Sequence, residues 1–130
     1  MESNKFHILV VDDDDDAREV MRRTLRAGGL SVVEARSGEE ALSLVHEVNP
    51  SIITLDVMMP GLDGPDTLQE LRKLPGMDAK PVIFMTAKVM DSEVQRSLDL
   101  GAIGVIPKPF DPMSLAQQVT TIWQESDSGK

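Results

Sequence analysis

Cysteine is absent from the 130-residue chain, so disulfide bonds, thiolate metal sites and thiol catalysis are excluded. No apolar run approaches the roughly 18 residues that a membrane-spanning helix needs. The N-terminal residues also lack the order of a signal peptide, because their short apolar run ends in aspartates and not in a small-residue cleavage site. We therefore expect a soluble, cytoplasmic protein with no membrane partner.

Basic residues are also scarce: 13 Lys and Arg stand against 22 Asp and Glu, and the formal net charge is −9. Direct binding of nucleic acid needs a basic surface, so we expect none. An acidic site in such a chain would instead favour a cation. Hydrophobic residues make up 41% of the chain, which is enough for one globular domain with one core.

Short aliphatic runs alternate with segments of helical periodicity along the whole chain. The runs predict five strands, at residues 6–11, 31–35, 51–59, 80–87 and 102–106. A helix is expected after each strand; the first, at 17–29, would bury a face of Ala17, Val20, Met21, Thr24 and Leu25. The last would start at Pro112 behind a capping Asp111. Five such units predict an α/β fold, a doubly wound five-stranded parallel sheet with helices on both faces.

Polar residues follow four of the five expected strands. Asp12 and Asp13 end the first strand, Asp56 ends the third, Thr86 ends the fourth, and Lys108 follows the fifth. Ligands of such sheets bind at the carboxyl ends of the strands, so we expect these side chains to converge.

The run of five aspartates at 12–16 is therefore divided between two roles. Asp14, Asp15 and Asp16 fall in the turn and the first helical turn, where carboxylates cap free N–H groups and favour the helix dipole. The other two join Asp56 and Lys108, and these four groups sum to a formal charge of −2. A hard divalent cation such as Mg²⁺ offsets that charge, and an aspartate beside a metal and a lysine is suited to accept a phosphoryl group.

Four motifs in this order and at these spacings resemble the receiver domain of two-component response regulators: ILVVDD, LDVMMPGLDG, MTA and KPF. Each motif is weak alone, but the four together are highly specific, and the resemblance covers about residues 6–124. It implies a flavodoxin/CheY-like sheet of order 2-1-3-4-5 with five helices. A receiver domain would occupy residues 1–124, and a flexible tail residues 125–130.

The resemblance also implies a role for each residue of the acidic cluster. Asp56 would be the phosphoacceptor. Asp13, Asp56 and the backbone carbonyl of Met58 would bind Mg²⁺ directly, whereas Asp12 would act mainly through metal-bound water.

Residues after the fourth and fifth strands would contact the phosphoryl group. Thr86 would bond to its oxygens, Lys108 would pair with it, and the backbone N–H groups of Ala87 and Met58 would complete the oxyanion site. The Lys108–Pro109 bond is typically cis in this family. The side chains at Met58 and Lys88 would modulate the access of water to the acyl phosphate.

Val105 departs from the family, which usually has Tyr or Phe three residues before the lysine. The chain contains no tyrosine at all, and valine is stiff at χ1 with no ring to swing. We therefore expect the phosphorylated state to be read through Thr86, the loop after it and the fourth helix.

The function implied is a signalling switch and not an enzyme with a separate substrate. A histidine kinase or a histidine phosphotransfer protein would phosphorylate it, and a target would bind the face of the fourth helix, fifth strand and fifth helix. We expect a stand-alone receiver; the alternative is a receiver fragment of a longer multidomain regulator or hybrid kinase. A haloacid-dehalogenase-type phosphohydrolase would need an acid where Met58 stands, and the aspartates at 12–16 would repel the phosphate of a flavodoxin-type cofactor.

Overall fold

Strands and helices alternate throughout the computed structural model of the chain, which describes residues 7–87 and 91–126. The strands are β1 (His7–Val11), β2 (Ser31–Ala35), β3 (Ile52–Asp56), β4 (Val82–Thr86) and β5 (Gly104–Pro107). The helices are α1 (Asp15–Ala27), α2 (Gly38–Val48), α3 (Gly64–Lys73), α4 (Asp91–Asp99) and α5 (Leu115–Glu125). No helix within the described ranges is long and apolar enough to cross a membrane.

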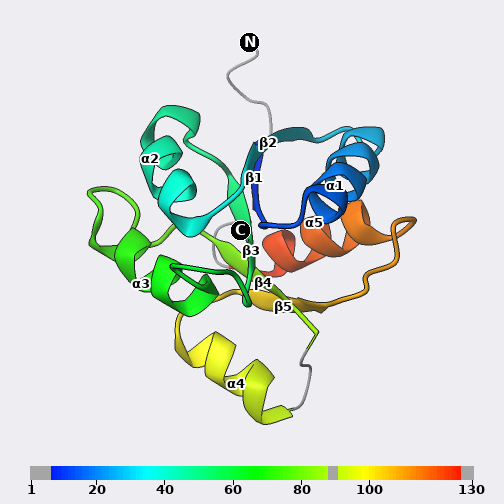
Figure 1. The fold of residues 1–130 in the computed structure, drawn as a ribbon. Coiled ribbons are helices and arrows are strands. Elements are labelled where there is room, and N and C mark those ends of the chain that lie inside the picture. Colours follow the sequence, from blue (N-terminus) through cyan, green and yellow to red (C-terminus); the bar gives the residue numbers. More distant parts are fainter. Residues whose placement is uncertain (1–6, 88–90, 127–130) are drawn as a thin grey trace.

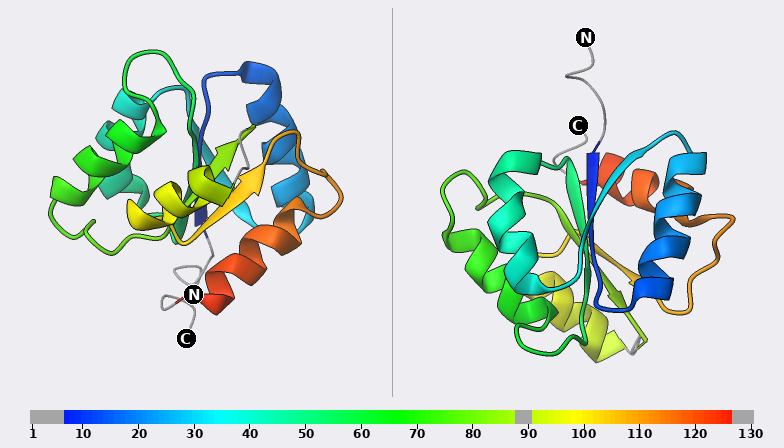
Figure 2. Two further views of the ribbon diagram at one scale, coloured as in Figure 1. Left: turned by 90° about the horizontal axis from the view of Figure 1, so that it is seen from below. Right: turned by 45° about the horizontal axis from the view of Figure 1, so that its top comes forward.

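The five strands form one parallel sheet in the order β2-β1-β3-β4-β5, which confirms the predicted fold class. Helices α1 and α5 cover one face of the sheet, and α2 and α3 cover the other (Figure 1). The same two layers are seen in the turned views, where α4 lies beside β5 (Figure 2). Every strand therefore points its carboxyl end toward one edge of the sheet.

The core consists of two apolar clusters because successive side chains of a strand point to opposite faces. One cluster joins Leu9 and Phe84 to the helices α2 and α3. The other joins Ile8 and Ile83 to α1 and α5. Strands buried on both faces are expected in a parallel sheet that is covered on both sides, and all five residues of β3 and of β4 are buried.

Capping side chains fix where the helices begin. The Asp14 carboxylate accepts a hydrogen bond from the Asp16 N–H (3.0 Å) at the start of α1, as the sequence predicts. At the start of α2, Ser37 Oγ accepts a hydrogen bond from the Glu40 N–H (3.0 Å). In a regular capping box the Glu40 carboxylate would accept from the Ser37 N–H, but here it accepts from the N–H of the preceding residue, Arg36 (2.7 Å).

Several predicted boundaries are corrected. Helix α1 spans Asp15–Ala27 and not 17–29, β4 spans Val82–Thr86 and not 80–87, and β5 spans Gly104–Pro107 and not 102–106. Strand β3 ends at Asp56 and not at residue 59, because the chain turns away and the Gly64 N–H bonds to the Val57 carbonyl (2.9 Å). Helix α5 begins at Leu115, since residues 112–114 form a turn in which the Asp111 carboxylate accepts from the Met113 N–H (3.0 Å). At its other end, α5 runs to Glu125, one residue into the predicted tail, and residues 127–130 lie outside the described part.

Helix α1 does not bury the whole face that its periodicity predicts. Met21 and Leu25 are buried, but Val20 is 40% exposed. Arg18 takes the inward position instead and is only 7% exposed. It stands three residues before Met21 and seven before Leu25, on the same side of the helix.

Candidate functional site

Three carboxylates converge at the carboxyl edge of the sheet. Asp12 and Asp13 follow β1, Asp56 ends the neighbouring strand β3, and each offers an oxygen within 4.8 Å of the other two. Asp12 and Asp56 are 1% and 6% exposed, whereas Asp13 is exposed. A single cation could therefore contact all three carboxylates from the solvent side.

Asp12 is held on several sides. Its Oδ1 accepts from the Asp14 N–H (2.9 Å), and its Oδ2 accepts from Lys108 Nζ (3.1 Å). Its own N–H bonds to the Ala35 carbonyl of β2 (3.2 Å), which extends the sheet by one residue. This carboxylate is thus fixed before any ligand arrives.

Lys108 reaches the same cluster from the loop after β5. Its backbone N–H bonds to the Thr86 carbonyl (2.8 Å), and its Nζ lies 3.4 Å from Asp56 Oδ1 in addition to the contact with Asp12. The Lys108–Pro109 peptide bond is cis, as the resemblance implies. The lysine offsets one of the three negative charges.

The local electrostatics favour a cation. Burial, followed by the charge of Asp12, raises the pKa of Asp56 to about 6, although Lys108 opposes the shift. Burial lowers the pKa of Lys108, but its hydrogen bond and charge contact with Asp12, followed by the charge of Asp56, outweigh that effect and raise it. The carboxylates therefore repel one another even with the lysine in place.

The donor set fits Mg²⁺, which takes one or two carboxylates and keeps several waters. Asp13 and Asp56, with Asp12 beside them, are the residues of this chain that would hold it. When bound, the ion would supply positive charge to a phosphoryl group at Asp56.

A glycine lets α3 start directly against this site. A Cβ atom at Gly64 would lie 2.7 Å from the Asp56 carbonyl and 2.8 Å from Val57 Cα, both of them backbone atoms. Asp63 caps the helix by accepting from the Asp66 N–H (2.9 Å). The loop between Asp56 and Gly64 carries Met58, whose side chain is 67% exposed.

The remaining residues predicted for the site lie on β4, β5 and the segment that follows β4. Thr86 is the last residue of β4 and is buried, Ala87 follows it and is exposed, and Lys88 lies outside the described residues. Val105 pairs in register with Phe84 and packs, partly buried, against the cluster of α2 and α3. Among the predicted site residues, Asp12, Asp13, Asp56 and Lys108 lie together in one cluster.

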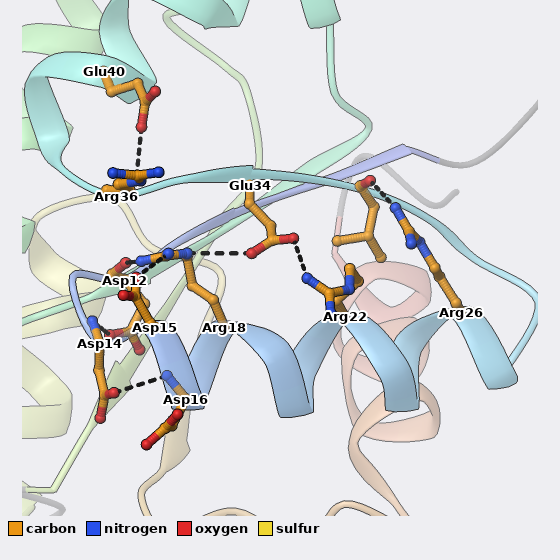
Figure 3. Close-up of polar contacts among 11 residues, drawn as sticks. Asp12, Asp14, Asp15, Asp16, Arg18, Arg22, Arg26, Glu34, Arg36 and Glu40 are labelled. Carbon is orange, nitrogen blue, oxygen red and sulfur yellow. Dashed lines mark hydrogen bonds and ion pairs between the residues drawn. The ribbon is translucent and has the colours of Figure 1, made fainter.

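Sequence reasoning missed Arg18, although its spacing from Met21 and Leu25 was a usable signal. Its Nη1 donates to the Asp12 carbonyl (2.8 Å) and its Nε to Glu34 Oε1 of β2 (3.2 Å). Figure 3 shows this side chain reaching from α1 to both.

Comparison with known proteins places the chain in one family. The family model described as "Response regulator receiver domain" matches residues 8–120. The chain belongs to the response regulator receiver domain family. The predicted resemblance is therefore confirmed, and the chain is a receiver domain of the two-component type.

Receiver relatives are found among both curated and solved proteins. The "Probable transcriptional regulator ycf27" of Cyanophora paradoxa is 38% identical over 98% of this chain and 52% of its own length. "Response regulator MprA" of Mycolicibacterium vanbaalenii is 46% identical over 79% of the chain and 44% of its own length. The chemotaxis protein CheY4 of Vibrio cholerae aligns with a TM-score of 0.84 at 27% identity, covering 91% of this chain and 98% of that one. This chain thus spans about half the length of the curated relatives.

Proposed function

We propose that this receiver domain is a phosphoacceptor switch in which Asp56 is phosphorylated in the presence of Mg²⁺. The observation that carries the proposal is the convergence of Asp12, Asp13 and Asp56 within 4.8 Å beside the ammonium of Lys108. A structural role alone would not favour three carboxylates at such short range, since they repel one another.

The chemistry follows from the groups present. An Asp56 carboxylate oxygen attacks the phosphorus of the donor, a P–O bond forms, and the bond from phosphorus to the donor's leaving group breaks with its electron pair. Lys108 Nζ, 3.4 Å from Asp56 Oδ1, places positive charge where the phosphoryl oxygens collect negative charge. Thr86 and the backbone N–H groups of Met58 and Ala87 are proposed to bond to those oxygens. The acyl phosphate later loses its phosphoryl group to water.

Intact-protein mass spectrometry tests this proposal. With acetyl phosphate and Mg²⁺, wild type should gain one phosphoryl group and Asp56→Asn none. Asp16→Asn is the matched control, because Asp16 lies in the same acidic region but outside the cluster and should label like wild type. Labelling of Asp56→Asn to the wild-type extent would refute the assignment of the acceptor.

The partners proposed are a histidine kinase or phosphotransfer protein as donor and a protein target of the face formed by α4, β5 and α5. Two features support that face: β5 is an edge strand, and Leu98 of α4 is 40% exposed. Pull-down with and without beryllofluoride tests it, and retention that is independent of beryllofluoride would count against a phosphorylation-dependent face. Because named relatives include a probable transcriptional regulator, the proposal that nucleic acid is not bound is limited to the residues of this chain.

No turnover of a separate substrate belongs to this proposal. Met58 occupies the position, two residues after Asp56, at which a phosphohydrolase of the aspartyl type needs an acid, and a thioether carries no proton. Chemistry would then be confined to phosphorylation and dephosphorylation of Asp56 itself.

A further inference from the structure

One arginine connects the start of the acidic loop to the neighbouring strand. Arg18 donates through Nη1 to the Asp12 carbonyl and through Nε to Glu34, and its Nη2 pairs with Asp15. The Arg18 side chain is 8% exposed, and its contact with the Asp12 carbonyl is buried, whereas the Asp15 side chain is 82% exposed. Figure 3 shows that the three acceptors come from the end of β1, from β2 and from the first turn of α1.

The contact with Asp12 acts on the backbone and not on the carboxylate. A peptide bond is planar, so holding the Asp12 carbonyl fixes the orientation of the whole peptide unit that leads into Asp13. Asp13 is exposed, and the position of its Cα and Cβ atoms follows from this peptide unit. The bond from the Asp14 N–H to Asp12 Oδ1 (2.9 Å) holds the next peptide of the loop.

Glu34 holds Arg18 in place and also pairs with Arg22, which serves as the comparison residue. Its Oε1 pairs with Arg18 (3.2 Å) and its Oε2 with Arg22 (2.8 Å), one turn further along α1. Arg22 shares this partner and its charge with Arg18, yet its contact shown in Figure 3 runs to Glu34 and not to the acidic loop. The two arginines thus share Glu34, but the contacts of Arg18 also include the Asp12 carbonyl and Asp15.

We propose that Arg18 is a positioning residue, which orients the Asp12–Asp13 peptide so that the acidic cluster binds its cation. This inference rests on the proposed function, because the cation is the one that supports phosphorylation of Asp56. Charge alone predicts the opposite effect: a buried guanidinium beside the cluster repels a cation, and its removal should tighten binding. The sign of the change therefore separates orientation from charge.

Isothermal titration calorimetry with Mg²⁺ alone, on the full chain, tests the proposal. Arg18→Met should weaken Mg²⁺ binding about tenfold, the usual effect of removing a group that orients a metal ligand. Arg18→Lys should weaken it similarly, because one ammonium keeps the charge but cannot bond to three acceptors in the geometry of a guanidinium. Arg22→Met should change the affinity less than about twofold.

Amide hydrogen exchange supplies a second readout that does not depend on the ion. Exchange at residues 13–16 should accelerate in both Arg18 variants without Mg²⁺ and should stay at the wild-type rate in Arg22→Met. Circular dichroism identifies any variant that does not fold, and Arg18→Lys decides the question if Arg18→Met is unfolded.

The outcomes separate the inference from the proposed function. Wild-type or tighter Mg²⁺ binding by a folded Arg18 variant, with wild type itself binding Mg²⁺ and gaining a phosphoryl group, would overturn the inference alone. Unfolding of both Arg18 variants would also overturn it, because the residue would then act on the stability of the whole domain. If wild type neither binds Mg²⁺ nor becomes phosphorylated, the proposed function itself fails.

Discussion

Lys108 and Asp12 lie 96 residues apart in the chain, yet Lys108 Nζ is 3.1 Å from Asp12 Oδ2. The Asp12 side chain is 1% exposed, so its charge is almost fully removed from water. A buried charge is tolerated only when it is paired, and the loop after β5 supplies the pairing cation. The ion pair therefore joins the segments that follow the first and last strands of the chain.

Replacing Lys108 by Met should destabilise the protein when no divalent cation is present. The Asp12 carboxylate would lose its cation, and the free energy of unfolding should fall by about 2 kcal/mol, less than for a fully buried pair because Lys108 is 24% exposed. Urea unfolding with a chelator measures this difference. Added Mg²⁺ should narrow it, since the ion would restore positive charge to the cluster.

Lys73→Met is the control for that measurement. Its ion pair with Glu70 (3.0 Å) is exposed on α3, and losing it should cost less than about 0.5 kcal/mol. Equal stability of Lys108→Met and wild type in the presence of chelator would show that the ion pair with Lys108 does not stabilise the buried Asp12 carboxylate.

Asp13→Asn should weaken Mg²⁺ binding at least about tenfold, because it removes a ligand carboxylate from the cluster. Asp16→Asn removes the same charge three residues later, from the first turn of α1, and should change the affinity less than about twofold. Calorimetric titration of both variants separates ligation from general acidity. A similar loss in the two would mean that only the total charge matters.

Thr54 carries a buried hydroxyl that finds no hydrogen-bond partner among the residues that the structure describes. It lies on β3 with 0% exposure, between Ile53 and Leu55 in a strand that is buried throughout. A methyl group of the same shape removes the cost of desolvating that hydroxyl, so Thr54→Val should raise the free energy of unfolding by about 1 kcal/mol. Chemical denaturation measures the change.

Thr67→Val makes the same chemical change where the hydroxyl is bonded. Thr67 Oγ1 donates to the Asp63 carbonyl (2.7 Å) at the start of α3, so this variant should lose about 1 kcal/mol. A loss of stability in Thr54→Val as well would show that the Thr54 hydroxyl is satisfied in solution.

Most of the fold could be predicted from the sequence because its signals are local and agree with one another. Five aliphatic runs, each followed by a helical pattern, are enough for a parallel sheet, and the strand order then followed from the resemblance. The boundaries were less predictable, because tertiary contacts set them. Strand β3 stops at Asp56 since Gly64 returns against it, and no local propensity of residues 57–59 indicates that turn.

The cluster could be predicted to converge because Asp12, Asp56 and Lys108 all stand at the carboxyl ends of strands. The residues that support the cluster were harder to predict. The spacing of Arg18 from Met21 and Leu25 indicates an inward position, but its partners depend on three-dimensional distances. Val20 was expected on the buried face of α1, but it is exposed, and Arg18 is buried instead. The guanidinium of Arg18 donates to Glu34 of β2. Hydrophobic periodicity favours aliphatic residues and overlooks an arginine that is buried with its partners.

The pairing of Glu34 with two arginines makes stability depend on pH. Burial alone would raise the pKa of Glu34, but hydrogen bonds from Arg22 and Arg18 and their charges outweigh it and hold the pKa below its usual 4.5. A carboxylate whose pKa is lowered by folding stabilises the native state above its unfolded pKa. That contribution is lost as the pH falls through the lower, native value.

Glu34→Gln should therefore be less stable than wild type at pH 7, and the gap should close as the pH falls below about 4.5. We expect a gap of about 1 kcal/mol, because the carboxylate is partly exposed and screened. Urea unfolding across that pH range measures it. Glu19→Gln, which removes an exposed pair with Arg23 (2.7 Å), should change stability by less than about 0.5 kcal/mol. A gap for Glu34→Gln that persists unchanged in acid would show that shape and not charge makes the difference, because the Glu34 carboxyl is then neutral and its charge no longer contributes.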